Sequence, residues 1–133
     1  MSKILVTGGS GFIGQALIPK LAKKHHEVHE VHSIERYVTG RYNHYQRKDA
    51  EDQKHYLDLK DYHAVRTLVK ELQPEYVIHL AAISPVAYSY DHYVEVSEVN
   101  YISTINLAEA CRQINGFKQF LFSGTSEEYG LTR

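Results

Sequence analysis

The sequence contains a single cysteine and almost no net charge, and each of these shortages argues against a type of protein. Of its 133 residues one is cysteine, three are proline and none is tryptophan. A single thiol, Cys111, cannot form an internal disulfide, which fits a reducing compartment, so we expect a cytoplasmic location. The formal net charge of −1 provides no electrostatic attraction to nucleic acid or to an anionic membrane.

Long apolar runs are also missing. No stretch approaches the length of a membrane span, and no apolar leader precedes the first predicted strand. The hydrophobic fraction of 43% and the charged fraction of 23% are ordinary for a globular protein. We therefore expect one domain over residues 1–133, large enough for a real core, with neither nucleic acid nor a membrane as partner.

The residues from Lys3 to Gly14, KILVTGGSGFIG, combine a short apolar strand, a glycine turn and the start of a helix. Gly8 allows a sharp turn, Gly11 lets a pyrophosphate approach the backbone, and Gly14 permits close helix packing. The phosphates would lie at the helix N-terminus. The spacing is G-x-x-G-x-x-G, not G-x-G-x-x-G, so a tight loop without a ligand is the alternative, but the position after a strand favours a dinucleotide site.

Short apolar runs alternate with helical patterns along the rest of the chain. Strands are predicted at residues 4–7, 27–34, 55–59, 76–80 and 118–123. Helices are predicted at 13–24, after the cap Asp61 as far as Pro74, and at 91–113. This alternation indicates an α/β fold with a doubly wound parallel sheet of order 3-2-1-4-5, and a ligand at the carboxyl ends of strands 1 and 4.

Helical spacing also predicts which residues face the core. In the first helix these are Ile13, Leu17 and Leu21. In the second they are Val65, Leu68, Val69 and Leu72, and in the third Val99, Ile102, Ile105 and Ala108.

Three histidines, His26, His29 and His32, lie three residues apart and raise the question of a metal site. On a strand such residues face opposite sides, so His29 points away from the other two and no metal is predicted. The polar segment 36–54 mixes arginines with tyrosines, which could suggest nucleic acid. Its acidic residues favour a solvated or subunit-facing loop instead.

Several segments in order resemble the nucleotide-sugar epimerases and dehydratases of the extended short-chain dehydrogenase/reductase family. They are TGGSGFIG at 7–14, Asp58-Leu59, HLAA at 79–82, the helix from Val99-Asn100 to Leu107, and FSGTSEEYG at 122–130. The helix has Ser103 where glycine is usual. Within the family, Thr125-Ser126-Glu127 and the stretch VHSIER are most similar to the GDP-mannose 4,6-dehydratases.

The resemblance implies an NAD cofactor, with NADP as the alternative, a nucleotide-sugar substrate and a homo-oligomer. Glu35 at the end of strand 2 would bind the ribose 2′-OH, whereas Arg36 would favour a 2′-phosphate; in another register His32 takes the acidic position. The predicted cofactor-binding residues are Gly8, Gly11, Phe12, Ile13, Gly14, Glu35, Arg36, Asp58, Leu59, Leu80, Ala81, Ala82 and Asn100.

The resemblance assigns catalysis to Thr125, which bonds the C4 hydroxyl, Ser126, which protonates the departing C6 oxygen, and Glu127, which removes the C5 proton. A carboxylate at this strand end could instead cap the next turn. Glu128 departs from the family, which has an apolar residue there.

The family's catalytic Tyr-x-x-x-Lys pair does not follow Tyr129-Gly130 before Arg133, so we expect a truncated cofactor-binding part. The alternatives are a 4-epimerase, a UDP-glucuronate decarboxylase or a non-catalytic nucleotide-binding module.

Overall fold

The computed structural model describes residues 1–33 and 51–131. Residues 36–50 of the predicted loop 36–54 therefore lie outside the described residues, as does Glu35, whereas residues 51–54 form a 3₁₀ turn and the first position of a strand instead of loop. Within the described ranges, no helix is both long and apolar enough to cross a membrane.

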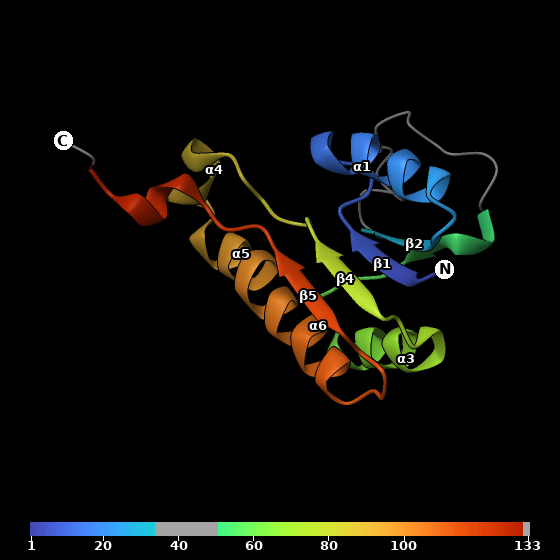
Figure 1. The fold of residues 1–133 in the computed structure, drawn as a ribbon. Helices are drawn as coiled ribbons and strands as arrows, with labels where there is room; N and C mark the ends of the chain where they lie inside the picture. Colours follow the sequence, from blue (N-terminus) through green and yellow to red (C-terminus); the bar gives the residue numbers. More distant parts are fainter. Residues whose placement is uncertain (34–50, 132–133) are drawn as a thin grey trace.

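A five-stranded parallel sheet forms the centre of the molecule (Figure 1). Its strands are β1 Lys3–Thr7, β2 Glu27–His32, β3 Lys54–Tyr56, β4 Tyr76–His79 and β5 Gln119–Phe122. The order β3-β2-β1-β4-β5 confirms the predicted doubly wound arrangement. Strands β2 to β5 are one or two residues shorter than predicted, β1 is one residue longer, and β3 follows a short 3₁₀-helix, η1 Glu51–Gln53.

Helices cover the two faces of the sheet, and each face has its own apolar core (Figure 1). Helix α1, Phe12–Lys23, packs Ile18 against Ile4, Val6 and Val28. Helices α3, Tyr62–Leu72, and α6, Ser103–Arg112, cover the opposite face. The core there consists of Leu5, Val31, Val65, Val69, Val77, Leu107, Ala110 and Cys111.

The predicted inner face of α1 is partly wrong. Ile13 is 56% exposed, while Gly14 and Ile18 are buried. Leu17 and Leu21 are only half-buried. The helix begins in close contact with the glycine turn, so its inner row is the one that contains Gly14, a residue that apolar counting ignores.

Helix α3 follows its prediction closely. The Asp61 carboxylate accepts a hydrogen bond from the Ala64 backbone N–H at 3.1 Å, which caps the first turn. Val65 and Val69 are buried, as the spacing indicates. The helix ends at Leu72, one residue before Gln73, which has the left-handed conformation.

The helix predicted at 91–113 is observed from Tyr93 to Arg112, as the consecutive segments α5 Tyr93–Ser97, the π-helical turn η2 Glu98–Ile102 and α6. A separate short helix, α4 Val86–Asp91, was not predicted and precedes it. The break at His92, whose ψ is 39°, separates α4 from α5. A wider π turn rotates the residues after it relative to those before it, so one spacing cannot describe both halves.

The predicted inner face of this helix is largely wrong for the same reason, although Val99 is half-buried. Ile102 and Ile105 are 40% and 44% exposed, and Ala108 is exposed, whereas Ser103, Asn106, Leu107, Ala110 and Cys111 are buried. Two of the buried residues are polar, and Asn106 donates to the carbonyls of Leu59 and Lys60 at 3.0 Å each. A count of apolar residues cannot find a face built on such bonds.

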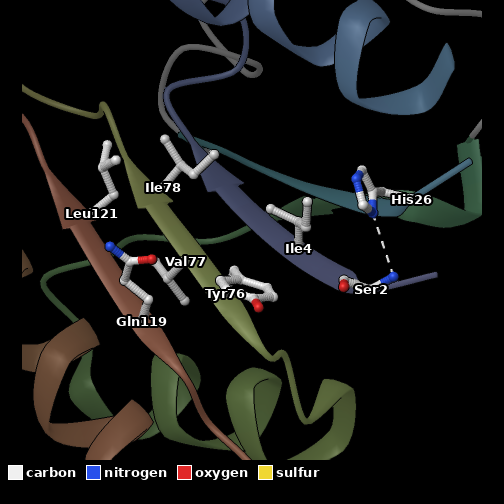
Figure 2. Close-up of a pocket in the computed structure, with 8 residues that line it drawn as sticks. All are labelled: Ser2, Ile4, His26, Tyr76, Val77, Ile78, Gln119 and Leu121. Atoms are coloured by element: carbon white, nitrogen blue, oxygen red, sulfur yellow. Dashed lines mark hydrogen bonds between the residues drawn. The ribbon is translucent and has the colours of Figure 1, made fainter. Parts of the chain in front are cut away.

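On the α1 side, part of the sheet beside that helix is left open as an apolar groove of about 270 Å³ (Figure 2). Figure 2 shows Ile4, Ile78 and Leu121 projecting from three adjacent strands into it. His26 closes one end, where its Nδ1 accepts a bond from the Ser2 N–H at 3.4 Å.

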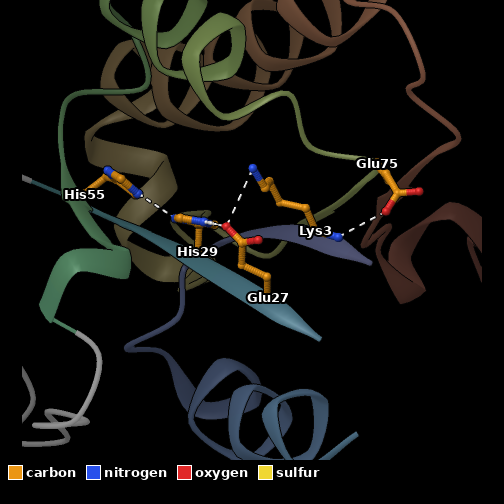
Figure 3. A network of polar contacts seen from close by, with 5 residues as sticks. All are labelled: Lys3, Glu27, His29, His55 and Glu75. Atoms are coloured by element: carbon orange, nitrogen blue, oxygen red, sulfur yellow. Dashed lines mark hydrogen bonds and ion pairs between the residues drawn. The ribbon is translucent and has the colours of Figure 1, made fainter. Parts of the chain in front are cut away.

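The other strand-2 histidines have different surroundings. His29 lies on the α3 face, where it bonds to His55 at 3.0 Å and to Glu27 at 2.8 Å, and Glu27 in turn lies 3.6 Å from Lys3 (Figure 3). The bond from His29 lowers the pKa of Glu27, and burial lowers the pKa of His55. Within the part of the chain described, no three histidine, cysteine or acidic side chains are placed to hold a metal.

Candidate functional site

A cavity of about 610 Å³ opens at the carboxyl edge of the sheet, next to the ends of β1 and β4, where the strand order predicts a ligand. The segments that follow β1, β2, β3 and β4 all contribute to its wall. The residues that line it include Gly8, Ser10, Gly11, Val31, His32, Ser33, Leu57, Asp58, Leu59, Lys60, Leu80, Ala81, Ala82, Ile83 and Val99.

The glycine turn has the geometry that its sequence predicts. Gly8 has φ +72°, and a β-carbon there would lie 2.7 Å from the Ala81 nitrogen. A β-carbon on Gly14 would lie 2.5 Å from the Gly8 carbonyl oxygen. Glycine is therefore needed at Gly8 for the turn and for contact with β4, and at Gly14 so that α1 can begin directly above the turn.

Gly11 differs from the other two. It is the N-cap of α1 with extended backbone, and a β-carbon there would meet only the Gly8 oxygen, at 3.2 Å. Among the described residues no side chain caps the start of α1, and no acidic residue lies in its first turn. The positive end of the helix dipole and its N–H groups are thus available to an anion in the cavity, as a pyrophosphate requires.

Asp58 and Leu59 lie in the wall after β3, as predicted for an adenine site. The Asp58 Oδ1 accepts from the Lys60 backbone N–H at 2.9 Å, and its Oδ2 lies 3.8 Å from the Lys60 ammonium. These contacts hold the carboxylate in a turn beside the cavity.

At the end of β2 the cavity wall contains a histidine. His32 is 5% exposed, its ring stacks on Tyr56 at 5.7 Å, and its Nε2 lies 3.7 Å from the buried carboxylate of Glu30. This places His32 at the position that one of the two predicted registers gave it. The roles of Glu35 and Arg36 stay predictions, because both lie outside the described residues.

Leu80, Ala81 and Ala82 line the cavity after β4. Asn100, also predicted to bind the cofactor, lies behind the wall and bonds to one of the wall residues, Ile83. Its Oδ1 accepts from the Ile83 N–H at 2.7 Å, and its Nδ2 donates to the Ile83 carbonyl at 2.9 Å. Asn100 therefore fixes the cavity wall without lining the cavity.

Behind the same wall, His79 links β1, β4 and α6. It is 3% exposed, and burial lowers its pKa to about 4, so it is neutral at pH 7. Its ring bonds to the hydroxyls of Thr7 at 2.6 Å and Thr104 at 2.9 Å. The sequence prediction did not include it among the site residues, although a histidine inside the apolar strand YVIHL was the available signal.

Other predicted residues lie away from the cavity. Phe12 and Ile13 are 95% and 56% exposed and do not line it, because α1 turns their side chains outward. Thr125 is exposed and is not part of the wall. Ser126 begins a 3₁₀-helix, η3 Ser126–Tyr129, in which the side chains of Ser126 and Glu127 lie outside the described set.

The turn after β5 is capped by a residue that the prediction did not expect. The carboxylate of Glu128 accepts from the Thr125 N–H at 3.2 Å. Glu128, the position at which the sequence departs from the family, thus has a capping role. The capping alternative for Glu127 stays untested, because its side chain lies outside the described set.

The sheet order, the glycine turn and the cavity at the strand ends define a doubly wound α/β domain of the Rossmann class. A family model described as GDP-mannose 4,6 dehydratase matches residues 5–133. The chain belongs to this family.

Known relatives agree with this assignment. The chain is 34% identical to a GDP-mannose 4,6-dehydratase of Yersinia enterocolitica, with 100% of this chain and 38% of the relative covered. It is 31% identical to a UDP-N-acetyl-alpha-D-glucosaminuronate decarboxylase of Bacillus cytotoxicus, with 96% and 38% covered. The chain thus spans a little over a third of the length of these relatives.

Solved structures are similar in fold and sequence. A UDP-glucose 4-epimerase of Thermus thermophilus, in complex with NAD, has a TM-score of 0.67 at 32% identity, covering 84% of this chain and 34% of that one. The UDP-glucose 4-epimerase of Thermotoga maritima, with UDP-glucose, has a TM-score of 0.71 at 28% identity, covering 89% and 36%.

Proposed function

We propose that this chain binds NAD in the cavity at the carboxyl edge of the sheet and forms the cofactor-binding part, residues 1–133, of a nucleotide-sugar 4,6-dehydratase, a lyase. The observation that carries the proposal is the junction of β1, the glycine turn and the uncapped start of α1 in the cavity wall. The NAD named for the Thermus epimerase supports the choice of cofactor.

Each part of the wall has a separate task in this proposal. The turn from Gly8 to Gly11 and the first N–H groups of α1 hold the pyrophosphate. The Asp58 carboxylate accepts a bond from the adenine amino group, and the backbone of 80–82 supports the rest of the dinucleotide. The chemistry that NAD would supply there is uptake of hydride from C4 of the sugar and its later return, while these residues would orient the cofactor.

The catalytic residues follow β5, and parallel strands bring the end of β5 to the same edge of the sheet as the cavity. Thr125 would bond the sugar C4 hydroxyl. Glu127 would then remove the proton from C5, which the C4 keto group makes acidic, and Ser126 would protonate the C6 oxygen as it leaves. The tyrosine base that takes the C4 hydroxyl proton belongs to the family pattern beyond residue 133.

Relatives with other activities define the alternatives. The Bacillus relative supports a decarboxylase as one alternative, and the two epimerase structures support a 4-epimerase as another. A non-catalytic nucleotide-binding module is an alternative of another class. We also propose a cytoplasmic homo-oligomer, as expected from the single cysteine and the family resemblance.

NAD binding is tested by calorimetric titration of the chain and its Gly11→Val variant. The backbone at Gly11 is extended, so valine can adopt it, but the side chain enters the space that the pyrophosphate needs. We expect a loss of affinity of about tenfold or more, equivalent to about 1.4 kcal/mol. Ala16→Val, which places the same side chain on the exposed side of α1, is the control and should bind as the wild type does.

Equal NAD affinity in the wild type and Gly11→Val would contradict the proposed site. The same titration with NADP tests the choice of cofactor. An NADP preference of tenfold or more would show that the assignment of NAD, with Glu35 at the ribose, is wrong.

A further inference from the structure

His79 is a buried imidazole with a partner on each ring nitrogen. Its Nδ1 lies 2.6 Å from the Thr7 hydroxyl at the end of β1, and its Nε2 lies 2.9 Å from the Thr104 hydroxyl on α6. His79 itself does not line the cavity. The residues after it in the chain, 80 to 83, do.

The other bonds of the two threonines determine where the protons lie. The Thr7 hydroxyl oxygen accepts from the N–H groups of Leu80 and Ala81, at 3.2 Å each, and the Leu80 N–H is shared with the Thr7 carbonyl at 3.1 Å. These N–H groups can only donate, so the hydroxyl proton is available to Nδ1 of His79.

The Thr104 hydroxyl determines whether Nε2 of His79 carries a proton. Thr104 donates its proton to the Asn100 carbonyl at 2.6 Å, so toward His79 it can only accept. His79 must therefore carry its proton on Nε2. The bonds form one directed chain from the N–H groups of 80 and 81, through Thr7, His79 and Thr104, to the backbone of Asn100.

This chain of bonds joins three parts of the cavity wall. Thr7 precedes Gly8, which contacts the backbone of Leu80 and Ala81 so closely that no β-carbon fits between them. Asn100, at the far end, holds Ile83 with two bonds. The segment 80–83 is thus attached to the glycine turn at one end and, through Asn100, to the π-helical turn η2 at the other.

We propose that His79 is a positioning residue that, in its Nε2–H tautomer, holds segment 80–83 against the glycine turn and so sets the shape of the dinucleotide cavity. The effect on binding rests on the proposed function. An apolar side chain could fill the same volume, but it would leave the buried Thr7 hydroxyl without its acceptor, and burying such a group unpaired is unfavourable.

The tautomer is tested first and without ligand. Nitrogen NMR of the full chain at pH 7 should show the proton of His79 on Nε2 and none on Nδ1. A proton on Nδ1, or a mixture of the two forms, would overturn the proposal whether or not NAD binds.

The effect on the cavity is tested with Thr104→Val, Thr104→Ser and the control Thr67→Val, on the exposed side of α3. NAD is titrated at a temperature where circular dichroism shows each variant fully folded, so a loss of stability alone does not change the affinity. We expect Thr104→Val to bind about tenfold more weakly, equivalent to one lost bond of about 1.4 kcal/mol. Thr104→Ser, which keeps the hydroxyl, should restore binding to within about twofold.

Wild-type affinity in Thr104→Val would overturn the positioning role. If the wild type itself binds no NAD, the proposed function fails instead, and hydrogen exchange decides the inference. Faster amide exchange at Leu80 and Ala81 in Thr104→Val than in Thr67→Val would support it, and equal exchange would overturn it.

Discussion

Gly11 and Gly14 are three residues apart in one turn, yet a side chain would be harmful at each for a different reason. At Gly14 the obstacle is the protein itself, because a β-carbon would lie 2.5 Å from the Gly8 oxygen and 2.7 Å from the Gly9 α-carbon. At Gly11 the protein leaves more room, and the obstacle would be the ligand. A substitution at Gly14 should therefore affect folding, and a substitution at Gly11 should affect binding.

Gly14→Ala should destabilise the fold. Alanine gains up to about 1 kcal/mol of helix propensity, but overpacking against rigid backbone costs about 1–3 kcal/mol or more, so the net loss should be about 1–2 kcal/mol. Urea unfolding measures this loss, with Gly11→Ala as the matched control. A Gly14→Ala variant as stable as the control would show that α1 can move away from the turn without any loss of stability.

His79 predicts how stability depends on pH. Its pKa is about 4 in the folded protein against 6.5 for the free side chain, so between these values the unfolded chain binds the proton and the folded chain does not. Stability from this residue is present above pH 6.5 and is lost as the pH falls toward 4. The full difference corresponds to about 3 kcal/mol at most.

Thermal unfolding between pH 4 and pH 7 measures this loss, with His79→Gln for comparison. The wild type should lose more stability than the variant across this range, because the variant has no proton to gain there. Parallel profiles would mean that other groups, such as His55, whose pKa burial also lowers, account for the pH dependence.

At the scale of the element, α6 shows how a polar residue can define the inner face of a helix. Asn106 is 9% exposed and donates two bonds to the carbonyls after β3, at the point where the chain passes Asp58. The same helix buries Cys111, and burial raises the pKa of its thiol to about 12, so this cysteine is unreactive near neutral pH.

Asn106→Ala should therefore cost about 1–3 kcal/mol of stability, because it leaves two carbonyl oxygens without their donor. It should also loosen the turn that holds Asp58. Urea unfolding gives the first effect, with Asn115→Ala at an exposed position as the control. No difference between the two variants would show that water replaces the lost amide.

At the scale of the whole molecule, the chain spans 38% of the Yersinia dehydratase, so catalysis is best tested in a hybrid. The part of that relative downstream of its match would be joined after residue 133. Residues 1–133 by themselves should not turn over GDP-mannose, because the position of the family's tyrosine base lies beyond residue 133.

In this hybrid Glu127→Gln should slow formation of the 4-keto-6-deoxy product by about 10²–10⁴-fold, since a positioned general base typically contributes that much. NAD binding should stay near normal, and some reduction of the cofactor should persist, because oxidation at C4 needs no second base. Glu128→Gln, which alters only the observed cap, is the control. Absorbance of reduced nicotinamide and mass spectrometry of the product measure the two steps.

If Glu127→Gln forms the deoxy product at the wild-type rate, Glu127 takes no part in the elimination. The 4-epimerase and decarboxylase alternatives would then gain over the dehydratase.

Local patterns were enough to predict much of this protein. The strand order, the turn at Gly8, the cap Asp61 and the buried face of α3 all follow from short-range signals, because they depend on neighbours along the chain. The place of the cavity follows from the strand order, since parallel strands end at one edge.

Only the tertiary structure decided the rest. One example is the break in the helices after β4. Another is the set of bonds that Asn106 and His79 make, which join residues 25 to 72 positions apart. No spacing along the chain encodes such contacts. A buried polar side chain is stabilised by the particular partners that the fold brings to it, so the sequence shows that His79 is present, whereas the packing of β1, β4 and α6 determines what it does.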